Sequence, residues 1–167
     1  HGNWNSFGIL VLVLLMVVGG GTCSAAGGLK QSRVYLLLKA LGWEFHRLMV
    51  SPRRVLRRAV WEGEQRVSVD DSRLCQVGVF VFLYLLALAV GTLVLCANGY
   101  ALRASLFEFA SALGTVGLSV GVTSPSAPKA VLWVETAGMF LGRLEFLVII
   151  AAISKTIRDM PRVLWRT

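Results

Sequence analysis

The sequence has few charged residues and few of the side chains that usually carry out catalysis. Only 16% of its 167 residues are charged, with nine acidic residues and two histidines in all. Soluble domains carry about 25% charged residues, so this composition argues against an ordinary soluble fold. Because 56% of the residues are hydrophobic and the mean hydropathy is +0.69, we expect lipid to surround much of the chain.

Cysteine is also scarce, and its placement excludes two kinds of stabilisation. Cys23, Cys75 and Cys96 are odd in number, lie in or beside apolar runs, and show no spacing that resembles a metal site. We therefore expect neither a disulfide nor zinc, and no cofactor in this chain.

Long hydrophobic runs are what the sequence does contain. Val77–Ala97 supplies 21 residues without a charged side chain, enough to cross a bilayer as a helix. Ala130–Ser154 is of similar length but carries Glu135, Arg143 and Glu145. Each central charge costs about 2.5–3.5 kcal/mol in a lipid-facing helix, so we expect these side chains to face protein or water.

The basic residues are distributed as the positive-inside rule predicts for a membrane protein. Ten of the 17 lie between Lys30 and Arg73, and four more follow the last apolar run from Lys155 on, whereas Arg103 and Lys129 flank the segment between the later spans. The loop 42–74 and the tail 155–167 are thus predicted to be cytoplasmic, and residues 98–130 external. Each basic cluster flanks a membrane segment, so no nucleic-acid partner is expected.

The first hydrophobic region is too long for one simple span. As one helix, Phe7–Leu41 would be roughly 50 Å long, whereas the hydrocarbon core of a bilayer is about 30 Å thick. Five glycines between Gly19 and Gly28 disfavour a continuous helix and predict two half-helices, Gly8–Val18 and Leu29–Leu41. Non-helical backbone at membrane depth has to line a water-filled cavity or pack in protein. The alternatives are a small-residue packing face, and a phosphate loop, which the order Gly28-Leu29-Lys30-Gln31 excludes.

A second irregular segment follows the charge-free span. Ser105–Gly114 is too short to cross a membrane, and a glycine-punctuated stretch comes directly after it. A helix that dips into the membrane with its C-terminus inward favours a cation, and a Thr-Val-Gly segment presents carbonyl oxygens as potassium filters do. Glu108 would then anchor the helix or hydrogen-bond the loop. The alternative is an interfacial helix with an ordinary loop, 114–128.

These residues resemble the TrkH/KtrB family of bacterial potassium-uptake membrane subunits, most closely the TrkH branch. The resemblance rests on three segments and covers essentially the whole chain: 19–30, 115–119 and 141–145. It implies an all-α membrane protein, the C-terminal part of a four-repeat helix, pore-loop, helix cation transporter. The chain then holds the last helix of repeat three (1–41), a basic linker (42–74), repeat four (75–154) and a tail (155–167). Within repeat four we expect membrane helices at 75–97 and 130–154, a pore helix at 105–114 and a filter at 115–119.

The resemblance also assigns the site residues. The potassium filter is Thr115, Val116, Gly117, Leu118 and Ser119, with K⁺ bound at the first three. The intramembrane gating loop is Gly19, Gly20, Gly21, Thr22, Cys23, Ser24, Ala25, Ala26, Gly27, Gly28 and the following Lys30. This chain has Ala25 where the family commonly has threonine, which removes one polar contact of the closed gate. Arg143 matches a pore-facing arginine, whose burial Glu145 or Glu135 would offset.

The family implies a setting as well. We expect a multi-pass protein of the bacterial inner membrane that takes up potassium and catalyses no reaction. Its implied partners are the lipid bilayer, a second copy of the full-length subunit and a TrkA/KtrA-like nucleotide-binding regulatory ring on the cytoplasmic face.

The opening residue, His1, suggests that an N-terminal part with three further filters is missing. A signal sequence over 7–24 is the alternative interpretation, but this stretch lacks the basic residues with which a signal sequence starts. The alternative function is a membrane scaffold or enzyme with a glycine-rich cleft, but no catalytic cluster at membrane depth supports it.

Overall fold

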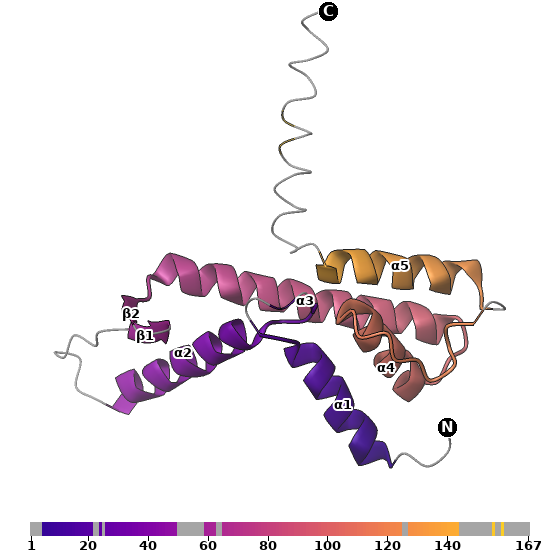
Figure 1. Ribbon diagram of the computed structural model, residues 1–167, viewed down its shortest axis with the longest axis horizontal. Helices are drawn as coiled ribbons and strands as arrows, with labels where there is room; N and C mark the ends of the chain where they lie inside the picture. Colours follow the sequence, from indigo (N-terminus) through magenta and orange to yellow (C-terminus); the bar gives the residue numbers. More distant parts are fainter. Residues whose placement is uncertain are drawn as a thin grey trace, which may run out of the picture.

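The fold is a set of helices arranged around one long central helix (Figure 1). The computed structural model describes residues 5–21, 24, 26–49, 59–62, 65–124, 127–143, 155 and 158. Over these residues the elements are α1 (Ser6–Val18), α2 (Gln31–Met49), β1 (Ala59–Glu62), β2 (Gln65–Ser68), α3 (Asp71–Ala97), α4 (Leu102–Leu113) and α5 (Lys129–Arg143). The chain is thus an all-α membrane protein to which one short hairpin is added.

Helix α3 is the spine of the molecule. Its first half packs against α2 and its second half against α4 and α5 (Figure 1). Phe80, Tyr84 and Leu95 are buried along the packed side, whereas Phe82 and Leu93 are about two-thirds exposed on the other. Among the described residues, α3 is the one helix long and apolar enough to cross a membrane. Its exposed apolar side is the kind of surface that lipid or further protein covers.

One aromatic ring of the short helix α4 packs closely against both α3 and α5. Phe109 is 3% exposed, and its ring fills the space beside two glycines on the flanking helices. A Cβ atom would lie 2.1 Å from the ring at Gly91 and 3.0 Å from it at Gly138. Small residues at helix contacts allow such close approach, and here they fix the depth at which α4 sits.

The two helices that flank the basic linker both extend further into it than expected. We expected the second half-helix to end at Leu41, but α2 continues through Gly42 to Met49, because residues 43–49 contain no proline or further glycine. At the other end α3 begins at Asp71, where the Asp70 side chain accepts a hydrogen bond from the Asp71 N–H at 2.9 Å. Helix α4 begins three residues before the expected range, at Leu102.

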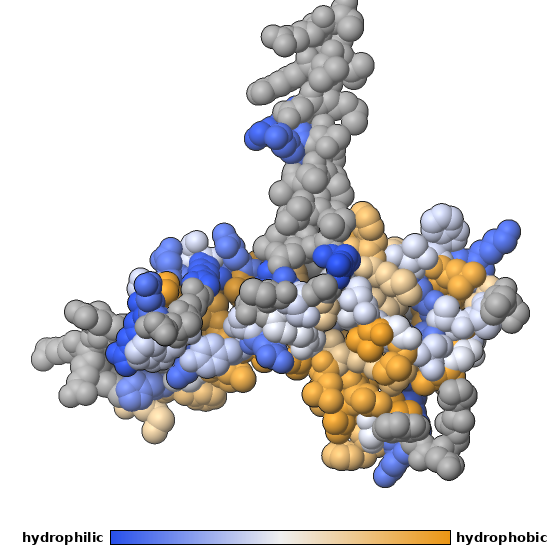
Figure 2. Space-filling view, viewed as in Figure 1, coloured by the Kyte–Doolittle hydropathy of each residue, from blue (hydrophilic) through white to orange (hydrophobic). Residues whose placement is uncertain are grey.

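The hairpin β1–β2 was not predicted from the sequence. Val60 pairs with Val67, and the Arg66 guanidinium lies 4.8 Å from the centre of the Trp61 ring. Val60 is 4% exposed and packs with Leu36 of α2 and Val77 of α3. The hairpin therefore closes the end of the α2–α3 pair, where hydrophilic side chains gather (Figure 2). The arginines of 53–58 and the end of the third expected span, 144–154, lie outside the described residues.

Candidate functional site

The break between α1 and α2 is a loop whose two ends touch each other. Gly19 and Gly28 have φ values of +70° and +95°, which favour glycine. The Leu29 N–H donates to the Val17 carbonyl at 2.9 Å, and the Gln31 N–H donates to the Gly20 carbonyl at 3.1 Å. Backbone groups that a helix would have used are therefore paired across the neck of the loop. Of the expected gating-loop residues, Thr22, Cys23 and Ala25 lie outside the described residues.

The end of α4 is closed by a Schellman motif. The Val116 N–H donates to the Ser111 carbonyl at 2.9 Å and the Thr115 N–H to the Ala112 carbonyl at 3.1 Å, with Thr115 at a φ of +54°. Threonine thus occupies a left-handed position that usually takes glycine. Since these bonds engage the last turn of the helix, carbonyl ligands for an ion would have to come from the residues that follow, where Gly117 has a φ of +82°.

The loop, the filter segment and α5 meet at three glycines, Gly27, Gly114 and Gly142, which we call the glycine junction. The Gly27 N–H donates to the Thr115 hydroxyl at 2.9 Å. A Cβ atom on Gly27 would lie 3.0 Å from the carbonyl oxygens of Leu113 and Gly114, and one on Gly142 would lie 1.9 Å from the Leu113 oxygen. The expected gating loop therefore lies directly against the start of the expected filter.

Glu108 ties the far end of the expected filter segment to α4. This side chain is 3% exposed. Its Oε1 accepts from the Ser119 hydroxyl at 2.6 Å and from the Thr123 N–H at 3.1 Å, and its Oε2 accepts from the Val120 N–H at 2.9 Å. The Thr123 hydroxyl also contacts Oε1. Of the two roles expected for Glu108, the structure therefore shows the second, hydrogen bonding to the loop.

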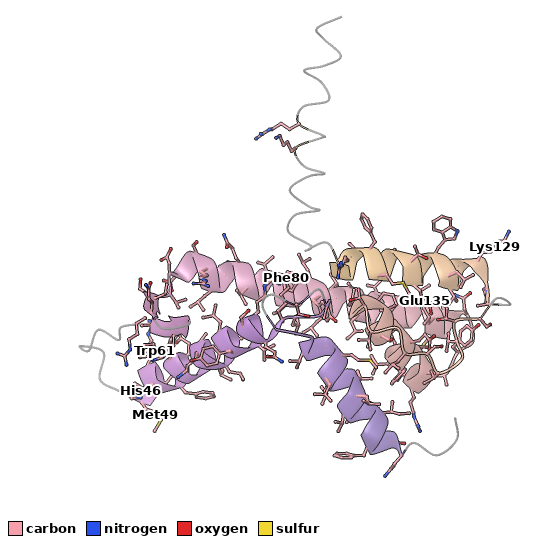
Figure 3. All side chains as sticks on the ribbon, viewed as in Figure 1. His46, Met49, Trp61, Phe80, Lys129 and Glu135 are labelled. Carbon is pink, nitrogen blue, oxygen red and sulfur yellow. The ribbon has the colours of Figure 1, made fainter. Side chains whose placement is uncertain are left out.

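A second buried carboxyl group joins this cluster from α5. The Thr123 hydroxyl oxygen lies 2.8 Å from Oε2 of Glu135, so one hydroxyl bridges two glutamates. Glu135 is 2% exposed, and its other oxygen, Oε1, has no hydrogen-bond partner within the part of the chain that the structure describes. Figure 3 shows Glu135 within the packed part of the molecule and Lys129 at the outer end of α5. Glu145 or Glu135 was expected to offset the charge of Arg143; the Glu135 carboxyl group lies against Thr123 instead, and Glu145 lies outside the described residues.

Arg143 lies at the opposite end of α5, next to the broken helix. With Lys30, Arg33 and Phe80 it lines a cavity of about 150 Å³ that Ser24, Ala26 and Gly28 of the loop also border. The Arg33 guanidinium lies 4.0 Å from the centre of the Phe80 ring. The loop and the arginine that the sequence singled out are therefore brought together on one side of the glycine junction.

The expected filter segment is hydrogen-bonded at both ends, to Gly27 at Thr115 and to Glu108 at Ser119. Between these ends the side chains of Val116 and Leu118 are about half exposed. Sequence reasoning missed Thr123, and it gave Gly142 no role of its own although this glycine lies within the segment 141–145 that carries the resemblance. Neither residue has a local signal for its role, because contacts from distant segments decide it.

Comparison with known proteins shows the family and the fold of the chain. The family model of the TrkH cation transport proteins matches residues 1–160. An uncharacterised cation transporter of Methanocaldococcus jannaschii is 27% identical over 165 residues, which cover 96% of this chain and 34% of the relative. The crystal structure of the potassium transporter TrkH from Vibrio parahaemolyticus superposes with a TM-score of 0.74 at 27% identity, covering 89% of this chain and 31% of that one.

This chain spans about a third of the length of both relatives. The family match nevertheless covers nearly all of its residues. The chain belongs to the TrkH family of cation transport proteins.

Proposed function

We propose that this chain supplies one filter segment and the gating loop of a potassium-uptake pore in the bacterial inner membrane. The observation that carries the proposal is the contact of two irregular backbone segments at the glycine junction, at the end of a helix too short to span. Support comes from the family match and from the potassium transporter that the chain resembles in structure. We refer below to the full-length protein containing this chain as the complete transporter.

In this proposal the carbonyl groups of Thr115, Val116 and Gly117 bind K⁺, and Leu118 and Ser119 complete the segment. Carbonyl oxygens replace the hydration shell of the ion, so selectivity depends on where the backbone is held. The half-exposed side of the segment is where three equivalent segments of the complete transporter would face it. One segment forms a quarter of such a filter.

The gate in this proposal is the loop from Gly19 to Gly28, with Lys30 after it. It lies against the start of the filter, where the Gly27 N–H bonds the Thr115 hydroxyl. Arg143, across the small cavity from the loop, adds positive charge that raises the barrier for a cation while the loop is in place. Movement of the loop away from the junction would open the path.

The partners in this proposal are a second copy of the complete transporter and a cytoplasmic nucleotide-binding ring. The hairpin end of the α2–α3 pair, which belongs to the stretch of sequence rich in basic residues, would face such a ring. A positively charged surface of this kind favours an acidic partner surface and headgroups of anionic lipids.

Uptake measurements in cells test the proposal. The complete transporter, expressed in a potassium-uptake-deficient strain, should restore growth at low potassium and accumulate rubidium. Well-expressed protein in the membrane that gives neither growth nor rubidium uptake would show that the chain serves a different function.

Excision of the loop tests the gate. Gly19 and the Gly27–Gly28 pair already adjoin, since a Cβ on Gly19 would lie 2.4 Å from the Gly27 oxygen. Deleting Gly21–Ala26 therefore removes the loop while leaving its neck and the glycine junction. We expect potassium flux to rise severalfold, because the obstruction is gone. Flux equal to or below that of the parent, at matched expression, contradicts the gate assignment.

A further inference from the structure

The bridge between Glu108 and Glu135 requires a proton that neither glutamate carries in its ordinary ionised form. A threonine hydroxyl has one hydrogen, so it can donate to one acceptor at a time. The Thr123 hydroxyl oxygen contacts Glu108 Oε1 and lies 2.8 Å from Glu135 Oε2. If both carboxyl groups were ionised, one of these two contacts would set oxygen against oxygen with no hydrogen between them. One carboxyl group must therefore donate.

The other contacts decide which carboxyl group holds the proton. Both oxygens of Glu108 accept from backbone N–H groups, those of Val120 and Thr123, whose direction is fixed. A carboxylate is the form that accepts on both oxygens. Among the described residues, the Glu135 carboxyl group hydrogen-bonds only with the Thr123 hydroxyl, and its Oε1 is buried without a hydrogen-bond partner. Leaving a full charge at such a site is far more costly than leaving a neutral carbonyl oxygen there.

We propose that Glu135 is a neutral carboxylic acid that donates to the Thr123 hydroxyl, which in turn donates to the Glu108 carboxylate. The proton stays on Glu135, and each of the two contacts then has one hydrogen between its two oxygens. Glu135 is a positioning residue: it touches no part of the filter, but it orients the hydroxyl that completes the bonds of Glu108 to the filter segment.

The consequence for transport rests on the proposed function. Glu108 holds Ser119, at the end of the proposed filter, through a 2.6 Å hydrogen bond. Losing the Glu135 donor frees the Thr123 hydroxyl to rotate, which loosens one of the four bonds that orient Glu108. A filter that selects by the position of its backbone should then lose discrimination between potassium and sodium before it loses total flux.

Substitutions of Glu135 test the inference through potassium-to-sodium selectivity of the complete transporter. Glu135→Gln keeps an N–H donor at the same reach and should rescue selectivity to within about twofold of the parent. Glu135→Ala and Thr123→Val remove the donor or the bridge and should lower selectivity about tenfold, as expected for a lost hydrogen bond to a charged group. Thr123→Ser keeps the hydroxyl and should behave as the parent does.

If Glu135→Gln loses selectivity to the same extent as Glu135→Ala, Glu135 is ionised and the inference is wrong. A readout without transport guards against failure of the proposed function or of folding. The infrared spectrum of the purified parent transporter, minus that of Glu135→Gln, should contain the C=O stretching band of a protonated carboxylic acid. A difference spectrum with only carboxylate bands overturns the inference, whatever the protein transports.

Discussion

Replacing Gly142 by alanine should reduce potassium uptake by the complete transporter to below about a tenth of the parent rate. The added Cβ would lie 1.9 Å from the Leu113 carbonyl oxygen, well inside contact distance. The oxygen belongs to backbone at the end of α4, so it cannot move as a side chain does. Overpacking of this kind costs about 1–3 kcal/mol or more, and here it separates α5 from the start of the proposed filter segment.

A matched control is available on α3. Gly78 is also helical, but a Cβ there meets no atom within 4 Å, so Gly78→Ala should keep parent uptake. Alanine favours a helix more than glycine does at both positions, so the change in helix propensity is the same in the two variants. A difference in their uptake at equal membrane expression therefore reports the steric contact between residue 142 and the Leu113 carbonyl. Parent uptake in Gly142→Ala would contradict the packing described at the glycine junction.

The second large effect is expected for Glu108→Gln, which should abolish potassium selectivity. Four donor groups from three residues, Ser119, Val120 and Thr123, converge on a carboxylate that is 3% exposed. A glutamine amide offers one oxygen and places its own N–H₂ against the remaining donors. Each buried group left unpaired costs about 1–3 kcal/mol, so the segment has to rearrange.

The measurement is the sodium-to-potassium uptake ratio, with thermal stability of the purified protein recorded alongside. Glu44→Gln is the matched control, since the Glu44 side chain is 55% exposed and its contact with Arg47, at 3.5 Å, lies at the surface. We expect the control to retain both properties, because exposed ion pairs contribute about 1 kcal/mol at most. An unchanged ratio in Glu108→Gln would show that the carboxylate is not what holds the filter segment.

Much of the fold could be predicted because hydrophobic length and glycine placement act locally. The charge-free run 77–97 predicted the spine helix, and the crowd of glycines between Gly19 and Gly28 predicted the break between α1 and α2. The short helix before Thr115 was expected as well, within three residues of its start. Each of these features follows from a stretch of sequence without knowledge of what packs against it.

The features that were missed depend on partners far along the chain. The hairpin forms because Val60 is covered by α2 and α3, and no part of its own sequence reveals that cover. The space that the Phe109 ring occupies exists because two other helices have glycine beside it, at Gly91 and Gly138. Glu135 or Glu145 was expected to offset the charge of Arg143, but the Glu135 carboxyl group, eight residues before Arg143 on α5, meets Thr123 of a distant loop instead. Spacing along one helix does not decide which neighbour from another segment a side chain meets.

Selectivity of a Gly117→Ser variant tests most directly the central claim that residues 115–119 form a potassium filter segment. Gly117 has a φ of +82° and no atom within 4 Å of a Cβ, so serine would fit but would strain or shift the backbone. Gly99 has a φ of +92° and equally open surroundings outside the segment, so Gly99→Ser is the control. We predict that rubidium uptake by Gly117→Ser becomes sensitive to competing sodium while Gly99→Ser discriminates as the parent does; parent discrimination in Gly117→Ser would contradict the assignment.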